Sequence, residues 1–213
     1  LQEDCPLALN TLKQASWLNA SSIPEALLID MIEIEDKNKA MEAWDDIKGR
    51  LKRYSLMRLD KENHLATIHP LLQEILRNKQ TEKEQIEIFK FVCKKMDEIF
   101  ANDKTSSSTY RGFLPHAERL NQHGKHFATL ANKLNDKYAS LLSTQPNCLN
   151  DIYFKLGLVK NYLVYLTTEK AAYEKLYGPQ YVYIATTLGN LGTVYYQLGL
   201  LKEAREYLER ALR

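Results

Sequence analysis

The residues best suited to metal chemistry are three histidines in the middle of the chain, His116, His123 and His126. His123 and His126 stand three residues apart, so a helix would place both imidazoles on one face, a spacing that could hold zinc. No carboxylate or cysteine stands at a matching interval, and Gly124 weakens the helix that would carry the pair. We therefore expect no metal site.

A phosphate-binding loop is also missing from the sequence. Such a loop needs glycines that expose backbone amides and a lysine that reaches the phosphates, in the pattern GxxxxGK[ST]. The only Gly-Lys pair, Gly124-Lys125, is followed by histidine and lacks the upstream glycine. No nucleophile motif such as GxSxG surrounds any serine. The sequence predicts no catalytic residue and no cofactor in this chain, so we expect it not to be an enzyme.

Composition narrows the class of protein further. The chain has 213 residues, of which 45% are hydrophobic and 26% charged, as in a typical globular protein. Its net charge of +2 is too small to create an electrostatic field that attracts nucleic acid or an anionic membrane. Cys5, Cys93 and Cys148 lie far apart and form no CxxC pair, which indicates a reducing, cytoplasmic environment. No apolar run approaches the roughly 18 residues of a membrane span. The chain starts with leucine, so the absence of a targeting signal carries no weight, and we expect the true amino terminus to lie upstream.

An internal repeat occupies the last third of the chain. Residues 153–160 read Tyr-Phe-Lys-Leu-Gly-Leu-Val-Lys, and residues 195–202 read Tyr-Tyr-Gln-Leu-Gly-Leu-Leu-Lys. Five of the eight positions are identical, at an offset of 42 residues, which is in the range of helical repeat units. In the second copy, small Gly192 and Ala204 would let two antiparallel helices approach closely on either side of the break at Gly199.

This second copy resembles a tetratricopeptide repeat. The resemblance rests on seven positions: Leu188, Leu191, Gly192, Tyr195, Ala204, Leu208 and Ala211. The preceding segment, 174–180, is similar to the linker in the 42-residue repeats of kinesin light chains. The first copy departs from the pattern, because Tyr162 and Glu169 stand where Ala204 and Ala211 stand in the second. We interpret it as a degenerate or capping unit.

The resemblance also implies a binding groove. Tetratricopeptide hairpins stack into a concave surface that the first helix of each repeat lines. By repeat position, the groove residues are Thr186, Asn190, Thr193 and Gln197. Asparagine side chains in such a groove can hydrogen-bond the backbone of an extended peptide, so the expected partner is a protein or peptide.

Residues 1–78 have the pattern of a winged helix. Apolar spacing predicts helices over 7–18, from the Ser21–Glu25 segment to about Ile34, and over 40–54. Alternating residues around Asp60–Asn63 predict a short β-hairpin, and a closing helix follows Pro70.

Residues 79–145 are predicted to be a helical linker that joins the winged helix to the repeats at 146–213. We expect a helix within 81–103, a loop over 105–109, a helix that begins at Leu114–Ala117 and another over 127–142. The predicted fold is therefore mainly α: a winged helix with a small β-hairpin, a helical linker and an α-solenoid of tetratricopeptide repeats.

Three segments resemble a STAND-class (NB-ARC-type) regulatory ATPase: 53–57, 68–77 and Leu114-Pro-His-Ala117. In this family a histidine at the start of the last winged-helix helix contacts the phosphates of bound ADP, and His69 stands at that position. Proline replaces the aspartate that follows in the family. The resemblance implies an upstream nucleotide-binding domain that holds ADP or ATP, with this chain as its regulatory and protein-binding segment. The uncapped helix at Arg213 also suggests a fragment.

Two other functions remain open. A stand-alone scaffold or adaptor similar to kinesin light chains would have no nucleotide role. A winged helix could instead place its third helix in DNA, and five basic residues lie near that helix: Lys48, Arg50, Lys52, Arg53 and Arg58. However, residues 1–78 have a net charge of −3, from 10 basic and 13 acidic residues, whereas phosphate contacts need a positive excess. Nucleic acid is therefore the less expected partner.

Overall fold

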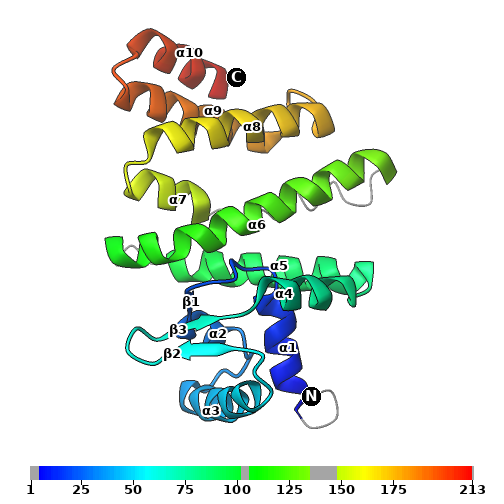
Figure 1. Cartoon of the computed structure of the whole chain (residues 1–213). Helices are drawn as coiled ribbons and strands as arrows, with labels where there is room; N and C mark the ends of the chain where they lie inside the picture. The colour runs from blue at the N-terminus through cyan, green and yellow to red at the C-terminus, as the bar shows by residue number, and fades with distance from the viewer. Residues whose placement is uncertain (1–4, 102–105, 135–147, 213) are drawn as a thin grey trace.

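The computed structural model describes residues 5–101, 106–134 and 148–212. Its elements stack along one direction, with α1 to α4 at one end, α5 and α6 across the middle and α7 to α10 at the other end (Figure 1). In chain order they are α1 (Pro6–Ala15), β1 (Ile23–Pro24), α2 (Glu25–Asp30), α3 (Lys37–Arg53), β2 (Arg58–Asp60), β3 (Leu65–Thr67), α4 (Pro70–Asn78), α5 (Glu82–Phe100), α6 (Ser107–Leu134), α7 (Cys148–Lys155), α8 (Val159–Tyr177), α9 (Val182–Gln197) and α10 (Leu201–Ala211). The mainly helical prediction is confirmed.

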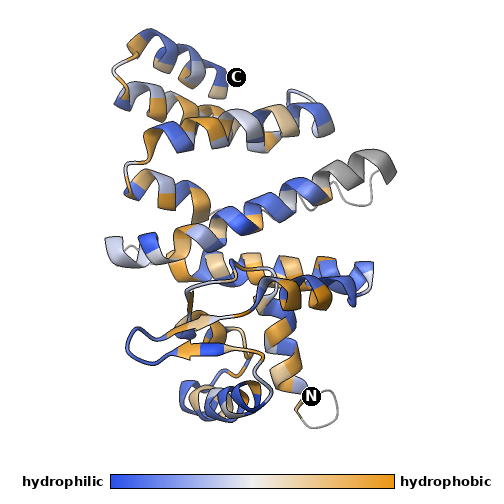
Figure 2. Cartoon of the chain, viewed as in Figure 1, coloured by the Kyte–Doolittle hydropathy of each residue, from blue (hydrophilic) through white to orange (hydrophobic). Residues whose placement is uncertain are grey.

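The three strands form one antiparallel sheet in the order β1-β3-β2. The expected hairpin is present, with Leu59 opposite Ala66. The Asp60 side chain accepts hydrogen bonds from the backbone N–H groups of Glu62 and Asn63, at 3.1 and 3.2 Å, which closes the turn. The loop between β2 and β3 is hydrophilic (Figure 2).

The second helix begins later and ends earlier than the sequence pattern predicts. Ile23 and Pro24 form strand β1 rather than a first helical turn, and α2 ends at Asp30 rather than near Ile34. Ile23 pairs with Ala66 and its side chain is fully buried. Because proline disfavours helical geometry in the residue before it, Ile23 was predisposed to the extended form.

Helix α6 is also different from the prediction. It begins at Ser107, so residues 107–109 are helical rather than loop, and Pro115 lies inside the helix rather than near its start. The Ser106 hydroxyl caps it by accepting from the backbone N–H of Thr109 at 3.2 Å. Tyr110 and Phe113 pack on Phe100, with ring centroids 5.1 and 5.5 Å apart. Pro115 has no backbone N–H to donate, and the helix continues through it with these two rings packed just before it.

Residues 127–134, for which a separate helix was expected, are the last part of this same continuous α6. The rest of that expected helix, 135–142, lies outside the described residues. Thr105 of the expected loop lies outside them too.

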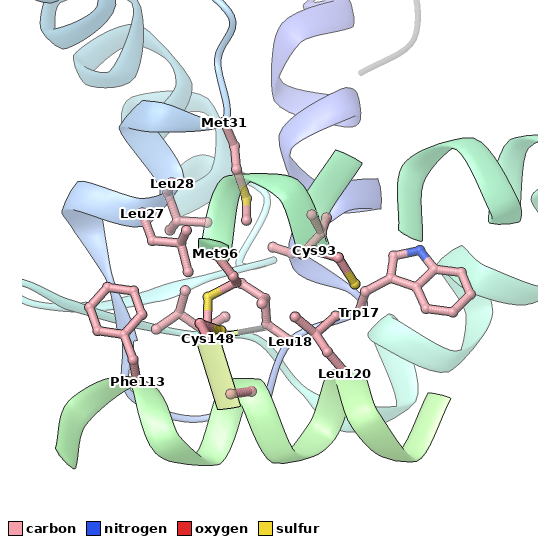
Figure 3. Packing of buried hydrophobic residues seen from close by; sticks show 14 of the residues in the cluster. Trp17, Leu18, Leu27, Leu28, Met31, Cys93, Met96, Phe113, Leu120 and Cys148 are labelled. Atoms are coloured by element: carbon pink, nitrogen blue, oxygen red, sulfur yellow. The ribbon is translucent and has the colours of Figure 1, made fainter. Parts of the chain in front are cut away.

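One hydrophobic core runs through most of the chain, from Cys5 to Val194. Figure 3 shows side chains from five parts of the structure meeting in it: Leu27, Leu28 and Met31 from α2 and its end, Trp17 and Leu18 after α1, Cys93 and Met96 on α5, Phe113 and Leu120 on α6, and Cys148 on α7. All three cysteines are buried and free. The amino-terminal elements and the long helices therefore share one packed interior.

The last four helices form two hairpins, α7 with α8 and α9 with α10. Gly157 and Gly199 lie in the two turns with φ of +64° and +75°, a backbone conformation that suits glycine. They are the same position of the 42-residue repeat. The sequence offset therefore corresponds to a repeated turn geometry.

Candidate functional site

The residues predicted to line the groove lie on one exposed side of α9. Thr186, Asn190, Thr193 and Gln197 are spaced four, three and four residues apart, so they follow one another along the helix. Three of them are exposed and Asn190 is half-buried. The opposite side of α9 is buried against α8 and α10 through Ile184, Leu188, Leu191 and Val194. Packing of that side leaves the polar stripe accessible.

Two exposed aromatic residues occupy the same position of the two repeat copies, and neither was among the residues predicted to line the groove. Tyr196 is 66% exposed and lies on α9 between Thr193 and Gln197. Phe154 on α7 is 45% exposed and stands 42 residues earlier, at the same repeat position. The sequence signal for them was the aromatic pair in each repeat copy, Tyr153-Phe154 and Tyr195-Tyr196. In each pair the first ring packs inward and the second is exposed.

Glu169 forms a polar cluster between α8 and α9. Its carboxylate accepts a hydrogen bond from the Tyr165 hydroxyl at 3.0 Å and another from the Thr187 hydroxyl at 3.3 Å. Tyr173 also donates to it. Burial raises the pKa of Glu169, although these hydroxyls and the charge of Lys125 act in the opposite direction. Glu169 thus stands at the repeat position of Ala211 and contacts the next hairpin through Thr187 on α9.

The stability of the protein should therefore depend on the ionisation of Glu169. Because its pKa is higher in the folded state, this group contributes stability that is present below the unfolded pKa of about 4.3 and is lost as the pH rises through the folded value. Glu169→Gln cannot ionise and should remove this part of the pH dependence. Urea denaturation at a series of pH values from below 4.3 upward measures the unfolding free energy of each protein. Glu206→Gln, at an exposed site, is the control. Parallel pH profiles for wild type and Glu169→Gln would contradict the assignment.

His69 lies at the N-cap of α4 and is exposed. Its Nδ1 accepts a hydrogen bond from the backbone N–H of Leu71 at 3.2 Å. Since the accepting nitrogen carries no proton, the neutral ring holds its proton on Nε2, which can donate to another group. A helix-capping role and a donor role are therefore compatible in this histidine. His69 also lines a groove of about 430 Å³ together with Ser55, Arg58 and Thr67.

Two further histidines, His116 and His123, have structural environments, whereas His126 is exposed. His116 is fully buried, its Nε2 lies 3.1 Å from the Ser22 carbonyl oxygen, and burial lowers its pKa to about 4. His123 packs against Trp17 with ring centroids 5.0 Å apart, and burial, aided by nearby arginines, lowers its pKa to about 3. In the described parts of the chain, no group of three or more His, Cys, Asp or Glu residues is arranged to hold a metal ion.

The comparisons with known proteins identify the carboxy-terminal part. Residues 147–213 match the family model of the tetratricopeptide repeat. No curated protein and no solved structure matches the chain. None of the helices in the described residues has the length and apolarity needed to cross a membrane. The match confirms the tetratricopeptide-repeat part of the prediction for residues 147–213 of this mainly helical chain.

Proposed function

We propose that this chain is the non-catalytic regulatory and protein-binding segment of a STAND-class nucleotide-dependent switch. The observation that carries the proposal is the tetratricopeptide match over residues 147–213, because such repeats generally mediate protein–protein interactions. The exposed stripe of Thr186, Asn190, Thr193 and Gln197 supplies hydrogen-bonding groups for a peptide backbone.

The amino-terminal elements support the regulatory part of the proposal. Their order is helix, strand, two helices and a β-hairpin that completes a three-stranded sheet with the first strand, which is the arrangement expected of a winged helix. A further helix, α4, follows the hairpin and begins at His69 and Pro70. In this proposal, the Nε2–H of His69 donates to a phosphate of ADP held by an upstream nucleotide-binding domain.

The role of His69 can be tested in the intact protein that carries the nucleotide-binding domain. A hydrogen bond to a charged phosphate contributes about 1.5–3 kcal/mol, so its loss should speed ADP release about tenfold or more. His69→Ser keeps a capping hydroxyl but loses the imidazole donor, whereas His69→Ala loses both. We expect fast ADP release in both variants, measured by stopped-flow fluorescence of labelled ADP.

Stability separates the two contributions of His69. Only His69→Ala should lower the unfolding free energy, by about 1 kcal/mol, because it alone removes the cap. Equal rates of ADP release in wild type and both variants would eliminate the nucleotide-sensing role. An intact protein that binds no ADP would instead favour a stand-alone scaffold or adaptor, which needs no nucleotide.

The peptide groove can be tested on the chain itself. Peptides selected from a random-sequence display library against the wild type should bind the double variant Asn190→Ala/Gln197→Ala at least tenfold more weakly in calorimetry. The control is Lys202→Ala/Glu206→Ala, which also truncates two exposed side chains but lies on α10. Selected peptides that bind the first double variant as tightly as wild type would show that the stripe is not the binding site.

A DNA-binding role has weaker support. On α3, Lys48 pairs with Asp45 at 2.7 Å and lies 3.6 Å from Glu25. Arg50 pairs with Asp46 at 2.9 Å. These acidic partners reduce the positive potential that a helix needs in order to approach phosphates. Salt-dependent binding of the chain to a DNA duplex would favour this alternative.

A further inference from the structure

Helix α4 presents apolar side chains to solvent and a polar one to the interior. Leu71 and Ile75, one turn apart, are 58% and 43% exposed, whereas Gln73 is only 2% exposed. A surface helix usually has the reverse arrangement. The Gln73 amide donates to the carbonyl oxygens of Ala15 and Leu18, at 3.0 and 3.3 Å. These hydrogen bonds fix the inward side of α4 and leave its apolar pair outside.

The exposed pair borders the groove that also contains His69. This groove, about 430 Å³ in volume, runs between α4 and the segment that leads into β2. Its apolar lining includes Leu56 and Leu72, both half-buried, beside Leu71 and Ile75. Arg58 is the only lysine, arginine or carboxylate residue among the residues that line it, and its side chain is exposed. The groove therefore combines an apolar floor with one fixed positive charge.

We propose that this groove docks an acidic amphipathic helix of a partner protein. The apolar stripe of that helix would cover Leu71 and Ile75, and a carboxylate beside the stripe would pair with Arg58. Contiguous exposed apolar residues mark interaction surfaces, and a helix laid in a groove presents apolar anchors at intervals of three and four residues. The single positive charge selects a negatively charged flank. The site is separate from the repeat groove and extends the proposed function, and it shares His69 with the proposed ADP contact, so a docked helix would compete with the nucleotide-binding domain for this face.

A second copy of this chain is a poorer occupant on electrostatic grounds. A twofold interface brings the same patch of both copies together. The groove would then have to accommodate Arg58 from both copies, and neither groove lining contains a carboxylate to neutralise them. Like charges brought together at an interface oppose association. The charge pattern therefore favours a different chain with acidic residues.

The test uses the 213-residue chain and two synthetic helical peptides. Both have leucines at positions i, i+3, i+4 and i+7, and the positions beside this stripe are glutamate in one peptide and lysine in the other. In fluorescence anisotropy the glutamate peptide should bind at least tenfold more tightly. Leu71→Asp should abolish its binding, and Arg58→Glu should reverse the preference between the two peptides. Arg111→Glu makes the same charge change at an exposed site on α6 and should leave the preference unchanged.

Several outcomes would overturn the proposal. Absence of binding by the glutamate peptide, equal binding of both peptides, or an unchanged preference in Arg58→Glu would each contradict it. A concentration-dependent dimer in light scattering that Leu71→Asp dissociates would identify a second copy as the occupant instead. Circular dichroism of each variant checks that its helical content is retained. If Leu71→Asp fails to fold, Leu71→Ala replaces it, with an expected loss of at least fivefold in affinity.

Discussion

Replacing Gly192 with leucine is expected to unfold the α9–α10 hairpin. An added Cβ at Gly192 would lie 2.6 Å from Cγ of Leu208 and 3.2 Å from the backbone oxygen of Ala204. The Leu208 side chain can move, but the backbone of α10 can give way only if the two helices separate. Overpacking of this kind typically costs about 1–3 kcal/mol, and a whole isobutyl group at a helix crossing should reach the upper end. Loss of ellipticity at 222 nm, measured against temperature, reports the effect.

Gly189, one turn earlier on α9, provides the matched control. An added Cβ there meets no atom within 4 Å. Leucine has a higher helix propensity than glycine by nearly 1 kcal/mol, so Gly189→Leu should leave the melting temperature unchanged or raise it. Hydrogen exchange should locate the damage in Gly192→Leu to α9 and α10. Equal melting temperatures for Gly192→Leu and wild type would show that the two helices do not cross closely at this glycine.

Phe89→Ala is expected to have the largest effect on the stability of the chain. Phe89 on α5 is fully buried, with ring centroids 5.7 Å from Trp17 and 5.2 Å from Phe127. These rings come from the segment after α1 and from α6, so the variant removes a contact between three parts of the chain. Truncating a buried phenylalanine costs about 3–5 kcal/mol, a large fraction of the 5–15 kcal/mol that typically stabilises a protein. Urea denaturation of both proteins measures the difference.

The same urea denaturation shows whether the amino-terminal part and the repeats unfold together in one cooperative transition. Both tryptophans, Trp17 and Trp44, lie in the amino-terminal part, so their fluorescence reports on that part, whereas circular dichroism reports on all helices. Because the core is continuous from Cys5 to Val194, we expect the two signals to change together, both shifted by Phe89→Ala. Phe154→Ala removes the same ring from a 45% exposed site and should cost far less. Transitions that separate, with only fluorescence shifted, would contradict a shared core.

Local backbone features were predictable wherever the nearest residues decide the structure. Asp60 closes the hairpin through its own neighbours, and Gly157 and Gly199 mark equivalent turns. Pro70 and His69 define the start of α4. The two elements that the sequence predicted wrongly, strand β1 and helix α6, involve contacts between segments that are distant in the sequence. Strand β1 requires the pairing of Ile23 with Ala66, 43 residues away in the sequence. Helix α6 continues through Pro115, and its Tyr110 and Phe113 pack against Phe100 of α5.

The sequence by itself predicted tetratricopeptide repeats at 146–213, and residues 147–213 match that family model. The prediction was possible because helix crossings in such repeats require small residues at fixed intervals, such as Gly192 and Ala204. The sequence also indicated that His69 begins a helix. The structure adds which nitrogen of His69 can donate, because Nδ1 accepts the local capping hydrogen bond from the Leu71 N–H and a neutral ring then holds its proton on Nε2. Only the tertiary structure decided that Leu71 and Ile75 face solvent, because Gln73 on the inward side of α4 donates to the carbonyl oxygens of Ala15 and Leu18, 58 and 55 residues away. Contacts between distant segments leave no periodic signal in the sequence, so the exposed apolar groove became visible only in three dimensions.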